Sequence, residues 1–346
     1  MGMVALNCGV GDTGRRRLHG CGWLRCLALI MLLISSGLLP SVPGAADRDR
    51  PFRIGVLTDS WGPPPDVVGL RDGLLELGYR ENEDFELGVR FTQGDVTALP
   101  AAARQLVQYG VELIFAMSDD AAQAAQQATT RIPIVFVNAS DPVELGLVKS
   151  FARPGGNITG VAQLRLELSP KRLQVFHELV PSLKRVLFPY DVNHTSSVMA
   201  VRVYRDAAHR LGIMLVEKPV RTAEEARTTL AQVQKGEVDG ILQPPSVSLN
   251  IPGFILETST QRATPTMFDG MFYVEHGGLA SYGSNFYEAG KQAARLVDKI
   301  FKGTAVTEIP VESNTKIMFA INLKTAQALG LAIAPEVLFQ ADHIFR

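Results

Sequence analysis

Hydroxyl and carboxylate side chains gather in loops that directly follow three apolar segments in the N-terminal half of the chain. The segments end near Thr58, Met117 and Asn138, and each has the length and apolar character of a buried strand. Ligands in open α/β sheets bind beyond the carboxyl ends of the strands, so these loops could bind a small polar molecule. Their candidate ligand-binding residues are Ser60, Trp61, Ser118, Asp119, Ser140 and Asp141.

The same side chains have a simpler interpretation. A Ser or Asp in front of a helix often caps its first turn, and four of these candidates stand at such positions. Trp61 lies in a loop rich in Pro and Gly, where it could cover an apolar or aromatic ligand or pack within a rigid loop. The position of three such loops at one sheet edge favours a ligand site over capping alone. The exposed amide groups at helix N-termini would also attract a ligand carboxylate.

Three further loops in the C-terminal half, together with the end of a later strand, supply candidates of the same kind. A carboxylate in these loops could hold an ammonium group, or it could be an ordinary solvated acid. Tyr282 ends a predicted strand next to an expected hinge. These candidates are Asp191, Ser246, Phe268, Asp269 and Tyr282.

We expect no catalytic residues, no cofactor and no metal. The chain has neither a G-x-S-x-G nucleophile elbow nor a phosphate-binding P-loop. The five histidines after residue 46 are not paired at metal-ligand spacing, and all three cysteines lie before the apolar core of the N-terminal segment. An exported enzyme with Asp119 or Asp141 as a base is a weaker alternative, because no partner nucleophile accompanies either residue.

Strand and helix patterns alternate from Phe52 onward, which indicates parallel sheets covered by helices. Continuous apolar segments suit strands that are buried on both faces of a sheet. The predicted strands are Arg53–Thr58, Glu86–Thr92, Glu112–Met117, Pro133–Asn138, Ile158–Ala162, Arg185–Tyr190, Ile213–Lys218, Gly240–Gln243, Thr264–Phe268 and Leu279–Tyr282.

So many strands predict two doubly wound lobes joined by a hinge. We assign residues 52–161 and 284–304 to lobe I, and residues 162–283 and 305–346 to lobe II. The helix Phe286–Lys302 returns to lobe I in this assignment, so the chain crosses between the lobes about three times. The 300 residues that follow position 46 exceed a typical single domain, which agrees with two lobes.

Residues 1–46 have the three regions of a secretory signal peptide. Arginines at positions 15–17 precede an apolar core over Leu27–Ile34, and small residues follow up to Ala45 and Ala46. We expect cleavage near Ala46 and a periplasmic protein. An uncleaved membrane anchor is the alternative, although the apolar core is shorter than the ~20 residues of a spanning helix.

The charge balance argues against a nucleic-acid partner. The first 46 residues hold four of the 34 Lys and Arg and one of the 35 Asp and Glu, so residues 47–346 carry a net charge of about −4 with His neutral. A nucleic-acid-binding domain would instead present a basic face. We expect a monomer with a small-molecule ligand.

Several motifs together resemble the periplasmic substrate-binding proteins of ABC transporters, in particular the family of tryptophan/tyrosine-type uptake binders. The resemblance spans about residues 52–343. Its motifs are FRIGVL at 52–57, GLRDGL at 69–74, ELGY at 76–79, IPIVF at 132–136, SDPV at 140–143, LVKSFARPGGNITG at 147–160, GGLASYG at 277–283 and INLKTA at 321–326.

The resemblance implies a type I periplasmic binding fold that closes on a small ligand, possibly an aromatic or branched amino acid, and docks on a membrane ABC permease. It implies no catalysis. A ligand-sensing subunit that reports to a membrane signalling protein is the alternative. The ligand-facing positions of the family can be carried over residue by residue. The resemblance implies that they are Ser60, Ser118, Asp119, Ser140, Asp141, Ser246, Phe268 and Tyr282.

Two segments depart from the family pattern. Relatives often have a small Thr-Pro or Ser pair after the third strand, whereas this chain has Ser118, Asp119 and Asp120. Two acids there would repel a ligand carboxylate unless one of them faces away from the ligand. The stretch 249–253 is also unlike the usual helix start, so we expect an altered wall in the second lobe.

Overall fold

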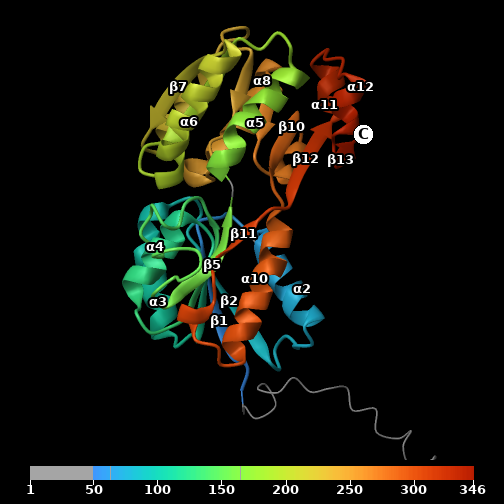
Figure 1. The fold of residues 1–346 in the computed structure, drawn as a ribbon. Helices are drawn as coiled ribbons and strands as arrows, with labels where there is room; N and C mark the ends of the chain where they lie inside the picture. The colour runs from blue at the N-terminus through green and yellow to red at the C-terminus, as the bar shows by residue number, and fades with distance from the viewer. Residues whose placement is uncertain (1–49, 63, 164) are drawn as a thin grey trace, which may run out of the picture. The chain divides into compact units, whose positions relative to one another are not determined.

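The computed structural model describes residues 50–62, 64–163 and 165–346, with the side chain of Arg165 left out. Within these residues the chain forms two β-sheets, each covered by helices on both faces (Figure 1). The predicted signal peptide, residues 1–46, lies outside the described residues. In the part of the chain that is described, no helix has the length and apolarity to cross a membrane.

The first sheet has six strands in the order β11-β5-β4-β3-β1-β2, and all its pairs are parallel. Strands β3 and β4 are buried along their whole length, which is why their sequences are apolar apart from Asn138. The strands of this sheet are β1 (Phe52–Thr58), β2 (Phe85–Phe91), β3 (Leu113–Ala116), β4 (Ile134–Ala139), β5 (Ile158–Gln163) and β11 (Glu312–Asn314).

Two pairs of helices cover the first sheet (Figure 1). One pair is α3 (Leu99–Gln108) and α4 (Asp119–Ala128), which share a core with the strands. The other pair is α2 (Pro65–Glu76) and α10 (Phe286–Phe301), which pack against each other. A Cβ atom at Gly69 would lie 2.0 Å from the backbone oxygen of Tyr287, so the second pair requires glycine at this contact.

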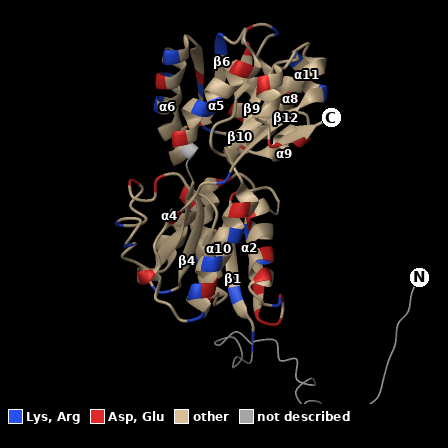
Figure 2. Ribbon diagram, turned by 45° about the vertical axis from the view of Figure 1, so that its right-hand side comes forward, with Lys and Arg blue, Asp and Glu red and all other residues tan. Residues whose placement is uncertain are grey.

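Polar contacts also join α2, and the turn that follows it, to α10. The Tyr79 hydroxyl donates to Asp298 at 2.9 Å, and Lys291 pairs with Glu76 at 2.7 Å. Acidic and basic residues are interspersed along both helices (Figure 2). Helix α10 thus packs with α2 against the first sheet.

The second sheet has seven strands in the order β13-β12-β10-β9-β8-β6-β7. Its pairs are parallel except β10 with β12, which are antiparallel. The chain re-enters this sheet at Ile317, opposite Ser284 where β10 leaves it, so the two strands run in opposite directions. The strands are β6 (Arg185–Asp191), β7 (Met214–Val220), β8 (Gly240–Leu242), β9 (Thr266–Phe268), β10 (Ala280–Ser284), β12 (Ile317–Asn322) and β13 (His343–Phe345).

Alternate side chains of β6 build the cores on the two faces of the second sheet. Val186 and Phe188 face the core beneath α5 and α6, whereas Leu187 faces the core beneath α7 and α8. The helices of this lobe are α5 (Arg165–Leu179), α6 (Thr195–Leu211), α7 (Ala223–Ala231), α8 (Ile251–Arg262), α9 (Met271–Glu275), α11 (Leu323–Ala328) and α12 (Pro335–Phe339). Across both lobes, the described residues also form the 3-10 turns η1 (Val96–Ala98), η2 (Ser248–Asn250) and η3 (Val306–Glu308).

The chain passes between the sheets three times, from β5 to α5, from β10 to α10 and from β11 to β12. The structure differs from the sequence assignment in one segment. The sequence predicts residues 305–346 in lobe II, but β11 pairs with β5 in the first sheet. The extended segment after α10 is held there because Val311 N–H donates to Phe151 O and the Thr159 hydroxyl donates to Ile309 O, both at 2.8 Å.

Candidate functional site

The N-terminus of α4 joins the ends of β3 and β4. The Ser118 hydroxyl accepts the N–H of Ala121 at 3.1 Å and so caps the helix. The adjacent Asp119 carboxylate is buried and accepts the backbone N–H of Ser140 at 2.7 Å. The two loops therefore form one unit at the carboxyl edge of the first sheet, where the sequence places candidate binding residues.

The hydroxyl of Ser140 lies inside this unit. Ser140 is 3% exposed, and its Oγ has no hydrogen-bond partner among the described residues. Buried polar atoms without a partner are uncommon in folded proteins, so each one calls for an explanation such as a ligand or a bound water. A ligand or a water molecule beside this loop would satisfy the Ser140 hydroxyl.

Asp141 and Ser60 form contacts within their own loops. One carboxylate oxygen of Asp141 accepts the N–H groups of Val143 and Glu144 at 3.1 and 3.0 Å, which stabilises the turn that follows β4. The Ser60 hydroxyl donates to Gly62 O at 2.9 Å. The helix-capping interpretation thus holds for Ser118, whereas Asp141 precedes a turn and not a helix.

A second polar network joins the ends of β6 and β8 in the second sheet. One oxygen of Asp191 accepts the N–H of Asn193 at 2.8 Å, and the other accepts the hydroxyl of Ser248. The Ser246 hydroxyl accepts the N–H of Ser248 at 2.9 Å. Asp191 therefore fixes the loop after β8.

Gln243 extends this network to β9. Its side-chain carbonyl accepts the N–H of Asp269 at 3.2 Å, and its amide group lies 3.5 Å from the backbone oxygen of Ser246. The three acidic and hydroxyl candidates of this half are all buried, namely Asp191, Ser246 and Asp269. Ser248, which the sequence does not predict, is buried as well. The loops at this edge are therefore held as a single polar layer.

Three aromatic candidates take different positions. Phe268 is fully buried and stacks on Tyr273 with ring centroids 4.9 Å apart, so its side chain belongs to a core of the second sheet. Tyr282 is half-buried, stands opposite Phe319 in β12 and packs against the other core. Trp61 is 55% exposed in the loop after β1. Of the three, Trp61 has its side chain free to meet solvent or a ligand.

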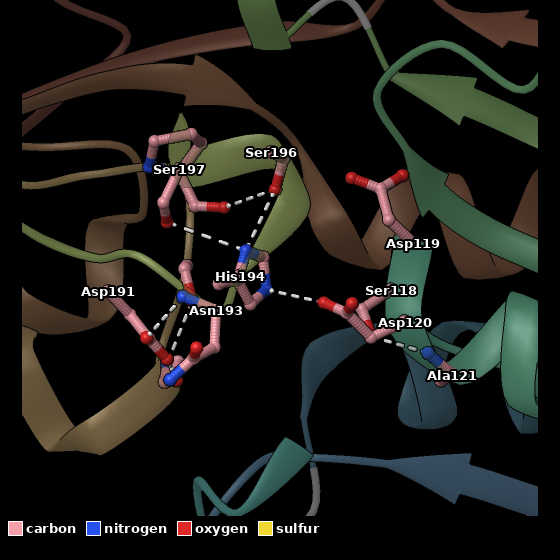
Figure 3. A network of polar contacts seen from close by, with 12 residues as sticks. Ser118, Asp119, Asp120, Ala121, Asp191, Asn193, His194, Ser196 and Ser197 are labelled. Atoms are coloured by element: carbon pink, nitrogen blue, oxygen red, sulfur yellow. Dashed lines mark hydrogen bonds and ion pairs between the residues drawn. The ribbon is translucent and has the colours of Figure 1, made fainter. Parts of the chain in front are cut away.

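One ion pair connects the loops at the carboxyl edge of the first sheet with those of the second. We call each of these two sets of loops a polar layer. His194 Nε2, in front of α6, lies 3.2 Å from a carboxylate oxygen of Asp120, in the first turn of α4 (Figure 3). The imidazole is buried, and its Nδ1 lies 3.2 Å from the Ser196 hydroxyl and 3.4 Å from that of Ser197. The pair thus brings the edges of both sheets together.

The environment of Asp120 raises its pKa to about 7, mainly through burial and then through the nearby charges of Asp119, Asp59 and Asp191. A hydrogen bond with the Thr195 side chain acts in the opposite direction. Asp120 therefore titrates close to neutral pH, unlike an ordinary aspartate.

A backbone hydrogen bond forms a second connection. Leu249 N–H, from η2, donates to Gly94 O at 3.4 Å. Gly94 has φ +81°, and a Cβ atom there would lie 3.2 Å from Trp61 Nε1 and 3.4 Å from Leu249 N. Leu249 and Asn250 both have φ 54°, a left-handed conformation that is uncommon for such residues. The altered wall expected at 249–253 thus has an unusual backbone.

The sequence of the chain matches a known protein family over most of its length. The family model described as ABC transporter substrate binding protein matches residues 64–345. The chain belongs to this family. The resemblance found in the sequence motifs is thereby confirmed.

Relatives of this substrate-binding protein agree with the assignment. A tyrosine-binding protein of Clostridioides difficile is 28% identical over 265 residues, which cover 76% of each chain. A crystal structure of a conserved domain protein from Vibrio cholerae has a TM-score of 0.77 at 26% identity and covers 86% of this chain and 100% of its own.

A solved ABC domain in complex with L-Trp, from Streptococcus pneumonia, has a TM-score of 0.75 at 24% identity and covers 85% of this chain and 100% of its own. This likeness concerns the fold. Together these structures confirm two α/β lobes of the type I periplasmic binding kind.

Asp120 and His194 were not among the residues predicted for the site of this substrate-binding protein. The signal in the sequence that points to His194 is its position between the end of a strand and the start of a helix. Among the described residues, no group of three or more His, Cys, Asp or Glu side chains could hold a metal ion.

Proposed function

We propose that this protein is an extracytoplasmic solute-binding protein of an ABC importer. It captures a small polar organic solute between its two lobes and delivers the solute to a membrane permease. An amino acid is the leading class of solute, and aromatic or branched amino acids come first. Support comes from the family, from the relative named as tyrosine-binding and from the neighbour solved with L-Trp.

The observation that carries this proposal is the pair of polar layers at the carboxyl edges of the two sheets. Each layer contains buried hydroxyls and carboxylates, and Asp120 of the first layer contacts His194 of the second. The partnerless hydroxyl of Ser140 supports a ligand that supplies the missing hydrogen bond.

The candidate residues then divide by role. We assign direct ligand contact to Ser140 and Ser246, one from each layer, and a covering role to Trp61. Buried acids and helix caps position the loops, and the two buried or half-buried aromatic candidates support the walls. The positioning residues are Ser60, Ser118, Asp119, Asp141, Asp191 and Asp269, and the supporting aromatic residues are Phe268 and Tyr282.

The protein acts outside the cytoplasm as a monomer and without catalysis in this proposal. Residues 1–46 serve as its export signal, and cleavage falls near Ala46. Binding shifts an equilibrium between open and closed arrangements of the lobes, so the solute must bind the closed arrangement better than the open one. The closed arrangement is the one that a permease recognises.

A thermal-shift screen tests the proposal. The purified full chain is unfolded and refolded to remove bound solute, and it is then heated with L-tyrosine, L-tryptophan, L-leucine, sugars or purines. A ligand at ~100 times its dissociation constant adds about 2.7 kcal/mol of stability. For a chain of this size the expected rise in Tm is roughly 5–10 °C. A cooperative melt that no solute shifts would contradict the proposal.

A further inference from the structure

The three segments that cross between the lobes meet the first lobe at one level. β5 ends at Gln163 and β11 ends at Asn314, and these two residues stand opposite each other in the first sheet (Figure 1). β10 ends at Ser284, and the next residue, Asn285, is the N-cap of α10. Each crossing therefore has an amide residue, Gln163, Asn285 or Asn314, at its end in the first lobe.

Asn314 joins the second crossing to the third. Its side chain is fully buried, and its Nδ2 donates to Asn285 O while its Oδ1 accepts the N–H of Lys316, both at 3.0 Å. Asn285 N–H in turn donates to Lys316 O at 2.7 Å. This last bond continues the antiparallel pairing of β10 with β12. The two crossings thus form one hydrogen-bonded ribbon that ends at Asn314.

A second set of buried side chains holds the end of the first crossing. Gln163 Nε2 donates to Asn138 Oδ1, and Asn138 Nδ2 donates to Asp66 Oδ1 at 3.2 Å. All three residues are at most 5% exposed, so the loss of one would leave a buried polar group of the next without its partner. Asp66 lies in the first turn of α2. The end of β5 is therefore anchored to a helix of the first lobe.

Asn138 also connects this set to the loop of the proposed site. It stands two residues before Ser140, where the pairing of β4 with β5 is irregular, and its φ is 65°. Asparagine is one of the few residues besides glycine that adopt this left-handed conformation readily. The side chain of Asn138 then fixes the turn against Gln163. The loop that carries Ser140 and the end of the first crossing thus keep one relative position.

We propose that Asn314 and Asn138 are positioning residues of the hinge. Their amide groups hold the first-lobe ends of the three crossings as one rigid unit, so bending is confined to the side of the second lobe. Each closure then returns the second lobe to the same place opposite the Ser140 loop, and neither amide needs to touch the solute. This inference rests on the proposed function only in that the lobes close on a solute.

The test measures the distance between the lobes without any ligand. Cys8, Cys21 and Cys26 are the only cysteines of the chain, so their replacement by serine leaves a full chain ready for site-specific labelling. Spin labels are attached at Gln127→Cys in α4 and Arg202→Cys in α6, two exposed positions. Distance distributions from pulsed electron paramagnetic resonance are recorded for this chain and for variants made in it.

Asn314→Ala should raise the population outside the wild-type distance range about fivefold, which is the change in an equilibrium constant for one hydrogen bond of about 1 kcal/mol. Asn138→Gly should broaden the distribution in the same way, although glycine keeps the left-handed backbone. Asn157→Ala is the matched control, because it removes hydrogen bonds to Thr129 O and Ile132 O, at 3.1 and 2.7 Å, inside the first lobe. It should also lose stability in urea but keep the wild-type distances.

Asn314→Asp replaces Asn314→Ala if the alanine variant does not fold. Its carboxylate still accepts the N–H of Lys316 but cannot donate to Asn285 O, so it should broaden the distribution as well.

A wild-type distance distribution in the folded Asn314 variant would overturn the inference, and so would equal broadening in Asn157→Ala. A wild-type distribution in Asn138→Gly would overturn the role of Asn138. Because no solute is present, these outcomes are independent of whether the protein binds an amino acid, which the thermal-shift screen tests separately.

Discussion

The carboxylate of Asp119 accepts the backbone N–H of Ser140 at 2.7 Å, and this hydrogen bond ties the helix after β3 to the loop after β4. Asp119 is 1% exposed, so the bond is shielded from water. The contact orders the loop that carries the Ser140 hydroxyl, which has no hydrogen-bond partner among the described residues. It therefore links the stability of the first lobe to the geometry of the proposed binding site.

Asp119→Ala should lower the free energy of unfolding by about 1–3 kcal/mol, because the buried N–H of Ser140 loses its acceptor. Urea unfolding followed by circular dichroism measures the change. Gln105→Ala, at an exposed position of α3, is the matched control and should stay within about 0.5 kcal/mol of the wild type. Equal stability of the two variants would remove Asp119 from this role.

The raised pKa of Asp120 predicts a pH-dependent stability. A carboxyl group whose folded pKa lies above its ordinary value of 3.8 contributes its full stability below that value, and the contribution is lost as the pH rises toward about 7. Asp120→Asn should therefore become more stable relative to the wild type between pH 4 and pH 7, by up to about 1.4 kcal/mol per pH unit.

Urea unfolding of both chains at four pH values in this range measures the difference. The comparison cancels the titration of all other groups that the two chains share. A difference in unfolding free energy that stays constant with pH would contradict the prediction.

Gly94→Ala should destabilise the closed arrangement of the lobes. Both the positive φ and the close approach of Trp61 and Leu249 oppose a side chain at this position. Alanine in a left-handed conformation costs about 1–2 kcal/mol by itself. Gly212→Ala is a matched control, because Gly212 has φ +67° but no atom within 4 Å of the added Cβ.

Both glycine variants should lose stability in urea. Only Gly94→Ala should lengthen the distance between two spin labels, one attached to each lobe. An equal distance distribution in the two variants would show that the Gly94 contact does not affect closure.

Arg172 is a buried cation whose hydrogen bonds join three elements of the second lobe. It is 1% exposed, its Nη1 donates to the Tyr204 hydroxyl at 2.7 Å, and its Nε donates to Tyr282 O at 2.5 Å. Tyr204→Phe should lower the free energy of unfolding by about 1.5–3 kcal/mol, because a charged donor loses its acceptor. Tyr109→Phe, at an exposed tyrosine, is the control for thermal or urea unfolding.

The sequence predicts the sheets well because buried parallel strands are continuous apolar segments. All ten predicted strands correspond to strands of the structure, with ends that differ by a few residues. Two of the remaining three strands, β11 and β13, are three-residue edge strands that the sequence does not predict. Their pairing depends on where the chain arrives after α10 and α12, which local sequence does not encode.

The site is predicted less completely. Loops after strands identify hydroxyls and acids at the correct edges, but the pattern cannot tell a ligand contact from a helix cap such as Ser118. Phe268, at the end of a short strand, turns into the core. The pairing of Asp120 with His194 depends on the approach of two lobes, so nothing in either local sequence predicts it.

A calorimetric titration tests the central claim most directly. L-tyrosine and L-tryptophan are titrated into the refolded full chain and into Ser140→Ala and Ser246→Ala, with Gln105→Ala as the control. We predict one bound molecule of at least one of these amino acids per wild-type chain, at least tenfold weaker binding in each serine variant, and wild-type affinity in the control. No heat of binding from either amino acid, or equal affinity in all four chains, would contradict the account.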